Sequence, residues 1–122
     1  MAFIKATKGK KPVRLVIGGP SGAGKTYTAL IFAKYLAKLT GKPTAAVDTE
    51  HYRMSLYADK FDFEVDNFEP PFDPRILIKT IHDAEKGGYG QLIVDSSTHF
   101  YSGECGLLEI VQDAAKQKYG GN

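Results

Sequence analysis

Residues 19–26 read Gly19-Pro20-Ser21-Gly22-Ala23-Gly24-Lys25-Thr26 and fit the pattern G-x-x-x-x-G-K-[ST] at every fixed position. The glycines allow positive φ angles and let the backbone approach a phosphate closely. Successive N–H groups then form an anion nest at the positive N-terminal end of the following helix. In such a loop the lysine reaches the β- and γ-phosphates of a nucleotide, and the hydroxyl that follows it ligates Mg²⁺. The stretch therefore predicts a phosphate-binding loop.

The residues on either side of this loop supply the context that the motif requires. Val13 to Ile17 is a β-branched and aliphatic run, typical of a buried strand. Residues 24–39 place apolar side chains at helical spacing, and Gly41 and Pro43 end that helix. A glycine-rich turn without a ligand is the alternative, and a strand before the loop with a helix after it favours nucleotide binding.

The rest of the chain alternates between strands and helices. We expect strands at 44–48, 63–68 and 91–95 and helices from Asp73-Pro74 to Gly87 and over 106–118. Short continuous apolar strands between helices predict a mostly parallel sheet covered on both faces. The expected fold class is therefore α/β, a three-layer P-loop NTPase, with a basic arm at 1–12 and the core at 13–122.

Composition limits the classes of function. A formal charge of +2 is too small to imply a nucleic-acid partner by itself, and the four lysines of the arm favour a solvated tail over a phosphate-binding one. Cys105 is the only cysteine, which favours a reducing compartment. No apolar run approaches the ~20 residues of a membrane span. We expect a cytoplasmic protein without a membrane partner.

Acidic residues follow two of the predicted strands. Asp95 ends the run Leu92-Ile93-Val94, where a carboxylate holds Mg²⁺ beside Thr26; a capping aspartate is the alternative. Asp48 and Glu50 follow the strand at 44–48, and a glutamate there can deprotonate the attacking water. As a bare pair of acids they are equally typical of a surface loop.

Three segments together resemble one family. Residues 46–61 (AVDTEHYRMSLYADKF) resemble the segment of RecA-type recombinases that carries the catalytic glutamate, and they join the phosphate loop and residues 92–96 (LIVDS) in family order. Over roughly residues 13–119 the chain is similar to the RecA-like ATPase core. It looks most like phage-encoded ATP-binding proteins with an AAA/RecA-like domain, which act in recombination and single-strand annealing.

The resemblance implies roles for individual residues. Glu50 becomes the general base, and Tyr57 falls where the family stacks an aromatic ring on adenine; a core or rim tyrosine is the alternative. His99 and Tyr101 either face the γ-phosphate or have a structural role in their loop. Lys25, Glu50 and Asp95 form the expected catalytic set, and Thr26 and Asp95 the Mg²⁺ ligands. The expected ATP/ADP-binding residues are Gly19, Pro20, Ser21, Gly22, Ala23, Gly24, Lys25, Thr26, Tyr27 and Tyr57.

The chain departs from the family pattern after Asp95. RecA-like cores carry a further strand there, between the Walker B strand and the P-loop strand, and the family's DNA-contacting segments also lie beyond it. Nothing after residue 95 is typical of a strand, so we expect a core that is incomplete at its C-terminus. We expect a fragment of a longer protein; direct pairing of residues 13–17 with 91–95, or completion by a second copy, are the alternatives.

The expected function is a Mg²⁺-dependent ATPase acting in phage or bacterial DNA recombination or annealing. A nucleotide-dependent binding module with little hydrolysis is the alternative, with single-stranded DNA, a recombination protein or a second copy as possible partners. A small P-loop kinase is disfavoured, because such enzymes need an arginine-rich lid and the three arginines here are scattered.

Overall fold

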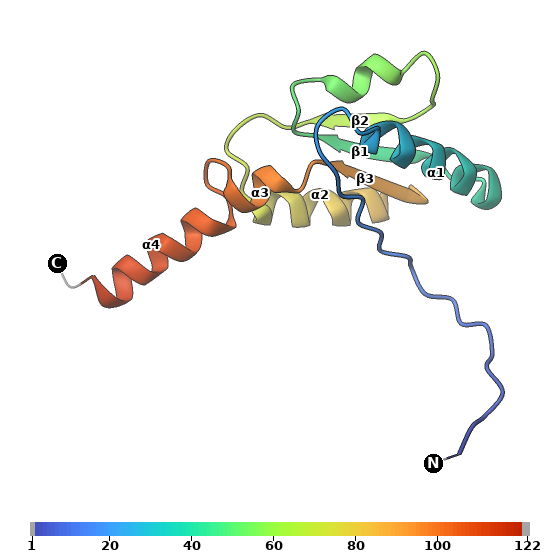
Figure 1. Cartoon of the computed structure of the whole chain (residues 1–122), viewed down its shortest axis with the longest axis horizontal. Helices are drawn as coiled ribbons and strands as arrows, with labels where there is room; N and C mark the ends of the chain where they lie inside the picture. Colours follow the sequence, from blue (N-terminus) through green and yellow to red (C-terminus); the bar gives the residue numbers. More distant parts are fainter. Residues whose placement is uncertain (1, 121–122) are drawn as a thin grey trace.

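The computed structural model describes residues 2–120, and its helices and strands begin at Lys25 (Figure 1). The elements are α1 (Lys25–Thr40), β1 (Thr44–Asp48), the 3₁₀ helix η1 (Arg53–Tyr57), β2 (Glu64–Asn67), α2 (Pro74–Lys86), β3 (Gln91–Asp95), α3 (Thr98–Ser102) and α4 (Leu107–Tyr119). No helix among the described residues is both long and apolar enough to span a membrane.

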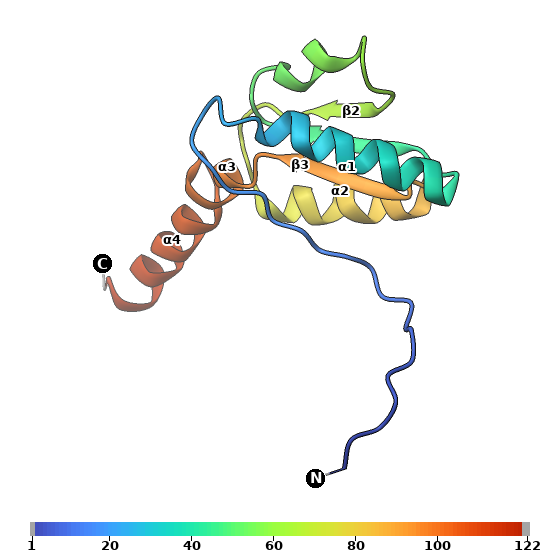
Figure 2. The same cartoon turned by 45° about the vertical axis from the view of Figure 1, so that its right-hand side comes forward.

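The sheet has the order β2-β1-β3, and both pairs of strands are parallel. In its register, Ala46 of the central strand lies opposite Val65 of β2 and Ile93 of β3. Figure 2 shows α1 and α2 on opposite sides of this sheet. The predicted α/β fold with helices on both faces of a parallel sheet is therefore confirmed.

The core is divided between the two faces of β1, because successive side chains of a strand point in opposite directions. Ala46 packs with Leu30 of α1 and with two side chains of the segment between β1 and β2, Met54 and Phe61. Val47 faces the other way and forms a second cluster, which is completed by Phe72 and Phe100. The central strand is thus buried on both faces, as its continuous apolar run predicted.

Local signals at the helix ends act as expected. Gly41 adopts a left-handed conformation with φ 69° and ends α1, its N–H donating to the Ala37 carbonyl. Asp73 caps α2 by accepting from Arg75 N at 2.8 Å. The Arg75 guanidinium also hydrogen-bonds this carboxylate, which lowers the pKa of the Asp73 carboxyl. These contacts depend only on neighbours in the sequence.

Two predictions about the backbone are wrong. Residues 13–17 form no strand, and Val13 and Val16 are 84% and 92% exposed. A strand needs a paired neighbour, and within the described residues the sheet ends at β3, so the expected alternative of direct pairing with residues 91–95 does not occur. After Asp95 we expected a loop before the last helix, whereas residues 98–102 form the short helix α3.

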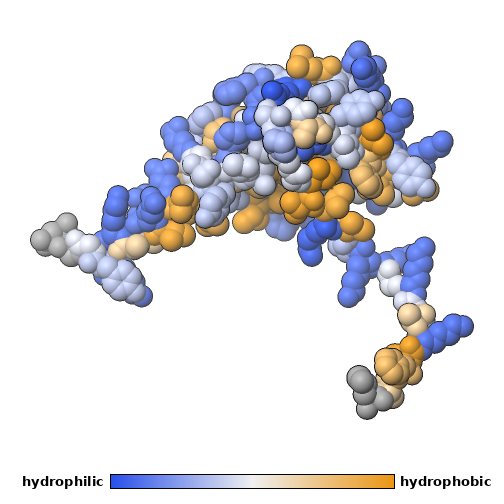
Figure 3. Space-filling model, viewed as in Figure 1, coloured by the Kyte–Doolittle hydropathy of each residue, from blue (hydrophilic) through white to orange (hydrophobic). Residues whose placement is uncertain are grey.

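Helix α1 carries apolar side chains on both of its faces. Leu30 and Ala33 are buried against the sheet. The opposite face is apolar as well, with exposed side chains at Ile31, Phe32, Tyr35, Leu36 and Leu39. Figure 3 shows apolar side chains on the surface of the body close to where the N-terminal segment leaves it. A helix that is apolar all round is typical of one covered on both sides.

A buried carboxylate organises the turn that follows β1. Asp48 is 1% exposed, and its two oxygens accept from Glu50 N at 2.7 Å and from Met54 N at 2.8 Å. The bond to Glu50 sets the backbone of that residue, and the bond to Met54 anchors the turn to a core side chain. Asp48 therefore has a structural role, in which it fixes the position of Glu50.

We expect Asp48→Asn to lower the free energy of unfolding by about 1–3 kcal/mol, the cost of leaving a buried polar group unpaired. In either orientation the amide NH₂ faces one of the two backbone N–H donors that the carboxylate now accepts from. Denaturant unfolding measures the change, with the exposed Asp59→Asn as the matched control. Equal unfolding free energies for Asp48→Asn and wild type would contradict this role.

Candidate functional site

The phosphate loop owes its shape to two glycines in the left-handed region. Gly22 has φ 79° and Gly24 has φ 88°, while Ala23 N donates to the Pro20 carbonyl at 3.2 Å. A Cβ at Gly22 or Gly24 would meet no atom within 4 Å, so space does not demand glycine there. The backbone conformation demands it, because left-handed φ values strain other residues.

The loop opens onto an N-terminus of α1 that carries no negative charge. Gly24 is the N-cap, no side chain caps it, and the first turn holds no acidic residue. The first N–H groups of a helix have no partner within the helix, so here they remain available to a ligand. The Lys25 ammonium contacts the Gly19 carbonyl and so lies back over the loop. This donor set fits a phosphate group.

The two predicted Mg²⁺ ligands are in direct contact. Thr26 Oγ1, in the first turn of α1, donates to Asp95 Oδ2, at the end of β3, at 2.6 Å. Hydroxyl and carboxylate oxygens are the ligands that Mg²⁺ prefers, and the ion retains waters and substrate phosphates besides. Residues 2–120 hold no cluster of three or more histidine, cysteine or acidic side chains for a metal. The Thr26–Asp95 pair is the donor set that fits Mg²⁺.

Glu50 lies at the same edge of the sheet. Asp48 and Asp95 are register partners at the ends of β1 and β3, and Glu50 follows Asp48 by two residues. Its side chain is about one-third exposed, and its Oε1 accepts from Ser96 Oγ at 3.2 Å. The parallel sheet therefore brings Glu50 to the edge that holds the Thr26–Asp95 pair, with part of its carboxylate open to solvent.

Tyr57, which the resemblance places on the adenine ring, lies beside Tyr27, another of the expected nucleotide-binding residues. The ring centroid of Tyr27, from α1, is 6.1 Å from that of Tyr57 and 5.4 Å from that of Phe61. Tyr57 packs against the core cluster beneath α1, whereas Tyr27 keeps much of its ring exposed. Tyr57 therefore packs into the rim of the core, the structural alternative weighed above, and still lies beside the loop's helix.

Two side chains of the site were not singled out from the sequence. Thr49 and Ser96 are each the first residue after a strand, and Ser96 N donates to Thr49 Oγ1 at 2.9 Å across the two strand ends. The Asp95–Ser96 peptide bond is cis. The sequence feature that could have identified them is that each is a polar residue directly after a strand-ending aspartate, Asp48 or Asp95. Tyr101, for which a role near the γ-phosphate was weighed, is exposed on α3.

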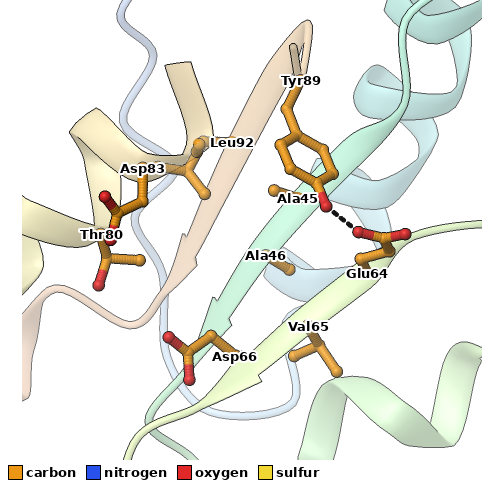
Figure 4. Close-up of a pocket in the computed structure, with 10 residues that line it drawn as sticks. Ala45, Ala46, Glu64, Val65, Asp66, Thr80, Asp83, Tyr89 and Leu92 are labelled. Carbon is orange, nitrogen blue, oxygen red and sulfur yellow. Dashed lines mark hydrogen bonds between the residues drawn. The ribbon is translucent and has the colours of Figure 1, made fainter. Parts of the chain in front are cut away.

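The sheet also has a hollow away from this edge. Figure 4 shows it between the β-strands and α2, with Ala45 and Ala46 labelled among its lining and a Tyr89–Glu64 hydrogen bond on one side. No residue of the phosphate loop lines it. The groups that fit a phosphate and Mg²⁺ converge at the loop, and we assign the site by those groups.

Comparison with known proteins agrees with this geometry. A family model described as an AAA domain matches residues 11–122 and so covers the loop, the sheet and α4. Neither the curated proteins nor the solved structures give a significant match. With the loop at an uncapped helix end and the Thr26–Asp95 pair beside it, the chain belongs to the AAA-domain family of P-loop ATPases.

Proposed function

We propose that this chain binds ATP with Mg²⁺ at residues 19–26 and hydrolyses it to ADP and phosphate. The observation that carries the proposal is the contact between Thr26 and Asp95 at the open N-terminus of α1. It joins a phosphate-binding loop to a carboxylate at the edge where parallel α/β sheets bind ligands. Among the described residues, the hollow beside α2 is lined by no lysine or arginine, and its charged side chains, Glu64, Asp66 and Asp83, are acidic and would repel a phosphate.

Each part of the site has a separate task in this proposal. The N–H groups of residues 21–26, apart from the Ala23 N–H that bonds within the loop, hold the phosphates, and the Lys25 ammonium neutralises the charge of the β- and γ-groups. Thr26 and Asp95 hold Mg²⁺, which when bound stabilises charge on the phosphate oxygens. Glu50 accepts a proton from the attacking water, for which its partly exposed carboxylate is suited.

For the base we propose adenine, bound on the Tyr27–Tyr57 pair. Both rings lie on the side of α1 that carries the core cluster with Phe61. Tyr57 is held by its packing, and the exposed part of Tyr27 offers an aromatic face. Stacking of a base on an aromatic side chain contributes about 1–3 kcal/mol and is tolerant of the base's identity.

Thermal unfolding with Mg²⁺ and ATP tests nucleotide binding. A ligand that binds only the folded state adds about 2.7 kcal/mol of stability at a hundredfold excess over its dissociation constant. We expect ATP to raise the melting temperature of the wild type and of Lys38→Ala, an exposed lysine of the same helix, but not of Lys25→Ala. Tripolyphosphate should raise it less than ATP, because it lacks the base. Equal shifts for the two lysine variants would contradict binding at the loop.

Phosphate release tests hydrolysis. We expect Glu50→Gln to lower kcat by about 100-fold or more, because a general base contributes 10²–10⁴-fold. The ATP-induced rise in melting temperature should remain, since Glu50 does not belong to the loop. The exposed Glu69→Gln serves as the control. Turnover that does not depend on Glu50, together with intact ATP binding, would favour a nucleotide-dependent binding module over an ATPase.

We further propose that the chain acts on single-stranded DNA, in recombination or annealing. Support comes from the resemblance of its motifs to recombination proteins and from the N-terminal segment. There the lysines Lys5, Lys8, Lys10 and Lys11 are all exposed. Extended basic segments bind nucleic-acid phosphates with a marked dependence on salt.

Binding of a labelled single-stranded oligonucleotide over a series of salt concentrations tests this proposal. Each lysine that contacts a phosphate contributes about 0.7 to the slope of log K against log salt. We expect replacement of the four arm lysines by alanine to flatten this slope, and replacement of Lys116 and Lys118 on α4 to leave it unchanged. Binding that does not depend on salt, or no binding in the presence of ATP, would contradict a direct DNA contact.

A further inference from the structure

His99 of α3 lies against the segment that carries Glu50. Its Nδ1 is 2.9 Å from Thr49 Oγ1 and 3.7 Å from Glu50 Oε1. Its ring stacks on Phe72, with centroids 5.0 Å apart and planes inclined by 31°. Phe72 belongs to the second core cluster, so one face of the imidazole rests on the core while its Nδ1 edge faces the site. The histidine is therefore held at a defined angle.

The hydrogen bonds of Thr49 indicate which atom donates to which. Thr49 is 2% exposed, and its hydroxyl has one proton and two lone pairs. One lone pair accepts from Ser96 N at 2.9 Å, and the carbonyl oxygens of Asp95 and Ser96 lie 3.3 and 3.2 Å away as acceptors for the proton. The second lone pair then faces His99 Nδ1. All these groups are satisfied when Nδ1 carries a proton and donates it to Thr49.

Ser96 and His99 both lie next to the same carboxylate oxygen of Glu50, Oε1. Ser96 Oγ donates to Oε1 at 3.2 Å, and the Nδ1–H group of His99 lies 3.7 Å from the same atom. The hydrogen bond from Ser96 favours negative charge on Oε1, and the imidazole edge, although its proton is directed at Thr49, lies beside the same oxygen. Among the described residues no donor contacts Oε2, so this oxygen is the one available to a water molecule.

We propose that His99 is a positioning residue for ATP hydrolysis: its Nδ1–H, donated to Thr49, fixes the segment that carries Glu50 and places the imidazole beside Oε1, so that Oε2 faces the attacking water. The inference rests on the proposed function, because it assigns a task within that reaction. His99 touches neither the phosphate loop nor the Mg²⁺ ligand side chains in the described structure, so it acts through Glu50 and contributes nothing to nucleotide binding.

Two amide substitutions separate this role from a general structural one. His99→Asn carries its amide N–H at the position of Nδ1 and can still donate to Thr49. His99→Gln is also a neutral amide, but its N–H lies one carbon further out, beyond Thr49. We expect His99→Gln to lower kcat by about 10- to 100-fold, the size expected when a reacting group is misplaced. His99→Asn should retain most of kcat, and both should keep the KM for ATP and its thermal shift.

The same two substitutions in the Glu50→Gln background complete the test. If His99 acts through Glu50, His99→Gln lowers kcat no further once the carboxylate has been replaced. Equal kcat losses for His99→Asn and His99→Gln, or a further loss in the Glu50→Gln background, would overturn the positioning role. Absence of turnover in the wild type would instead contradict the proposed hydrolysis itself. The exposed His82→Gln on α2 is the control for the substitution of a histidine.

Discussion

The hydrogen bond from Thr26 to Asp95 is the interaction on which the site depends. It joins the first turn of α1 to the end of β3 at 2.6 Å, and it is the only side-chain hydrogen bond between those elements in the described structure. Residues 13–17, which lead into the loop, are paired with no strand. The loop is therefore anchored to the sheet from its helical side, through this bond and the packing of Leu30 and Ala33.

The three acidic residues at the edge of the sheet have different tasks because their surroundings differ. Asp48 is buried, and both of its oxygens accept hydrogen bonds from backbone N–H groups, so it supports the turn and has no oxygen left for a ligand. Asp95 is half-buried and bonded to a hydroxyl that is itself a metal ligand in such loops. Glu50 and Asp95 each keep one carboxylate oxygen, Oε2 and Oδ1, that accepts no hydrogen bond among the described residues, whereas Asp48 keeps none. The positions of these three residues in the sequence do not distinguish their roles, whereas their burial and their hydrogen-bond partners do.

The parts of the fold that could be predicted are those set by near neighbours in the sequence. The strands at 44–48 and 91–95 are continuous apolar runs with clear ends, and Asp73-Pro74 begins a helix through a cap and a fixed φ. Residues 13–17 are also mostly aliphatic, apart from Arg14, yet they form no strand. A strand forms only where a neighbouring strand pairs with it, and the composition of a segment does not show whether such a neighbour is present.

In the candidate site, too, the residues set by local sequence could be predicted, whereas some of those set by distant contacts could not. Gly22, Gly24, Lys25 and Thr26 follow from one contiguous motif, and the contact of Thr26 with Asp95 follows from the parallel sheet. Thr49 and Ser96 could not be ranked from the sequence, because their hydrogen bond depends on the register of β1 against β3. The stacking of Phe72 on His99 likewise joins residues 27 positions apart through a turn whose path the sequence does not specify.

The phosphate loop and the Glu50 carboxylate depend on different parts of the fold. In the proposed function, phosphate binding draws on residues 19–26 and the end of one helix, so it would need little beyond a correctly folded α1. In the proposed mechanism hydrolysis needs Glu50, which contacts Ser96 and His99 and whose backbone N–H is bound by Asp48. A displacement of any of these residues moves the carboxylate while the loop stays intact. If the proposed function holds, binding is the more robust of the two activities, and turnover is the property that reports whether the whole edge of the sheet is assembled.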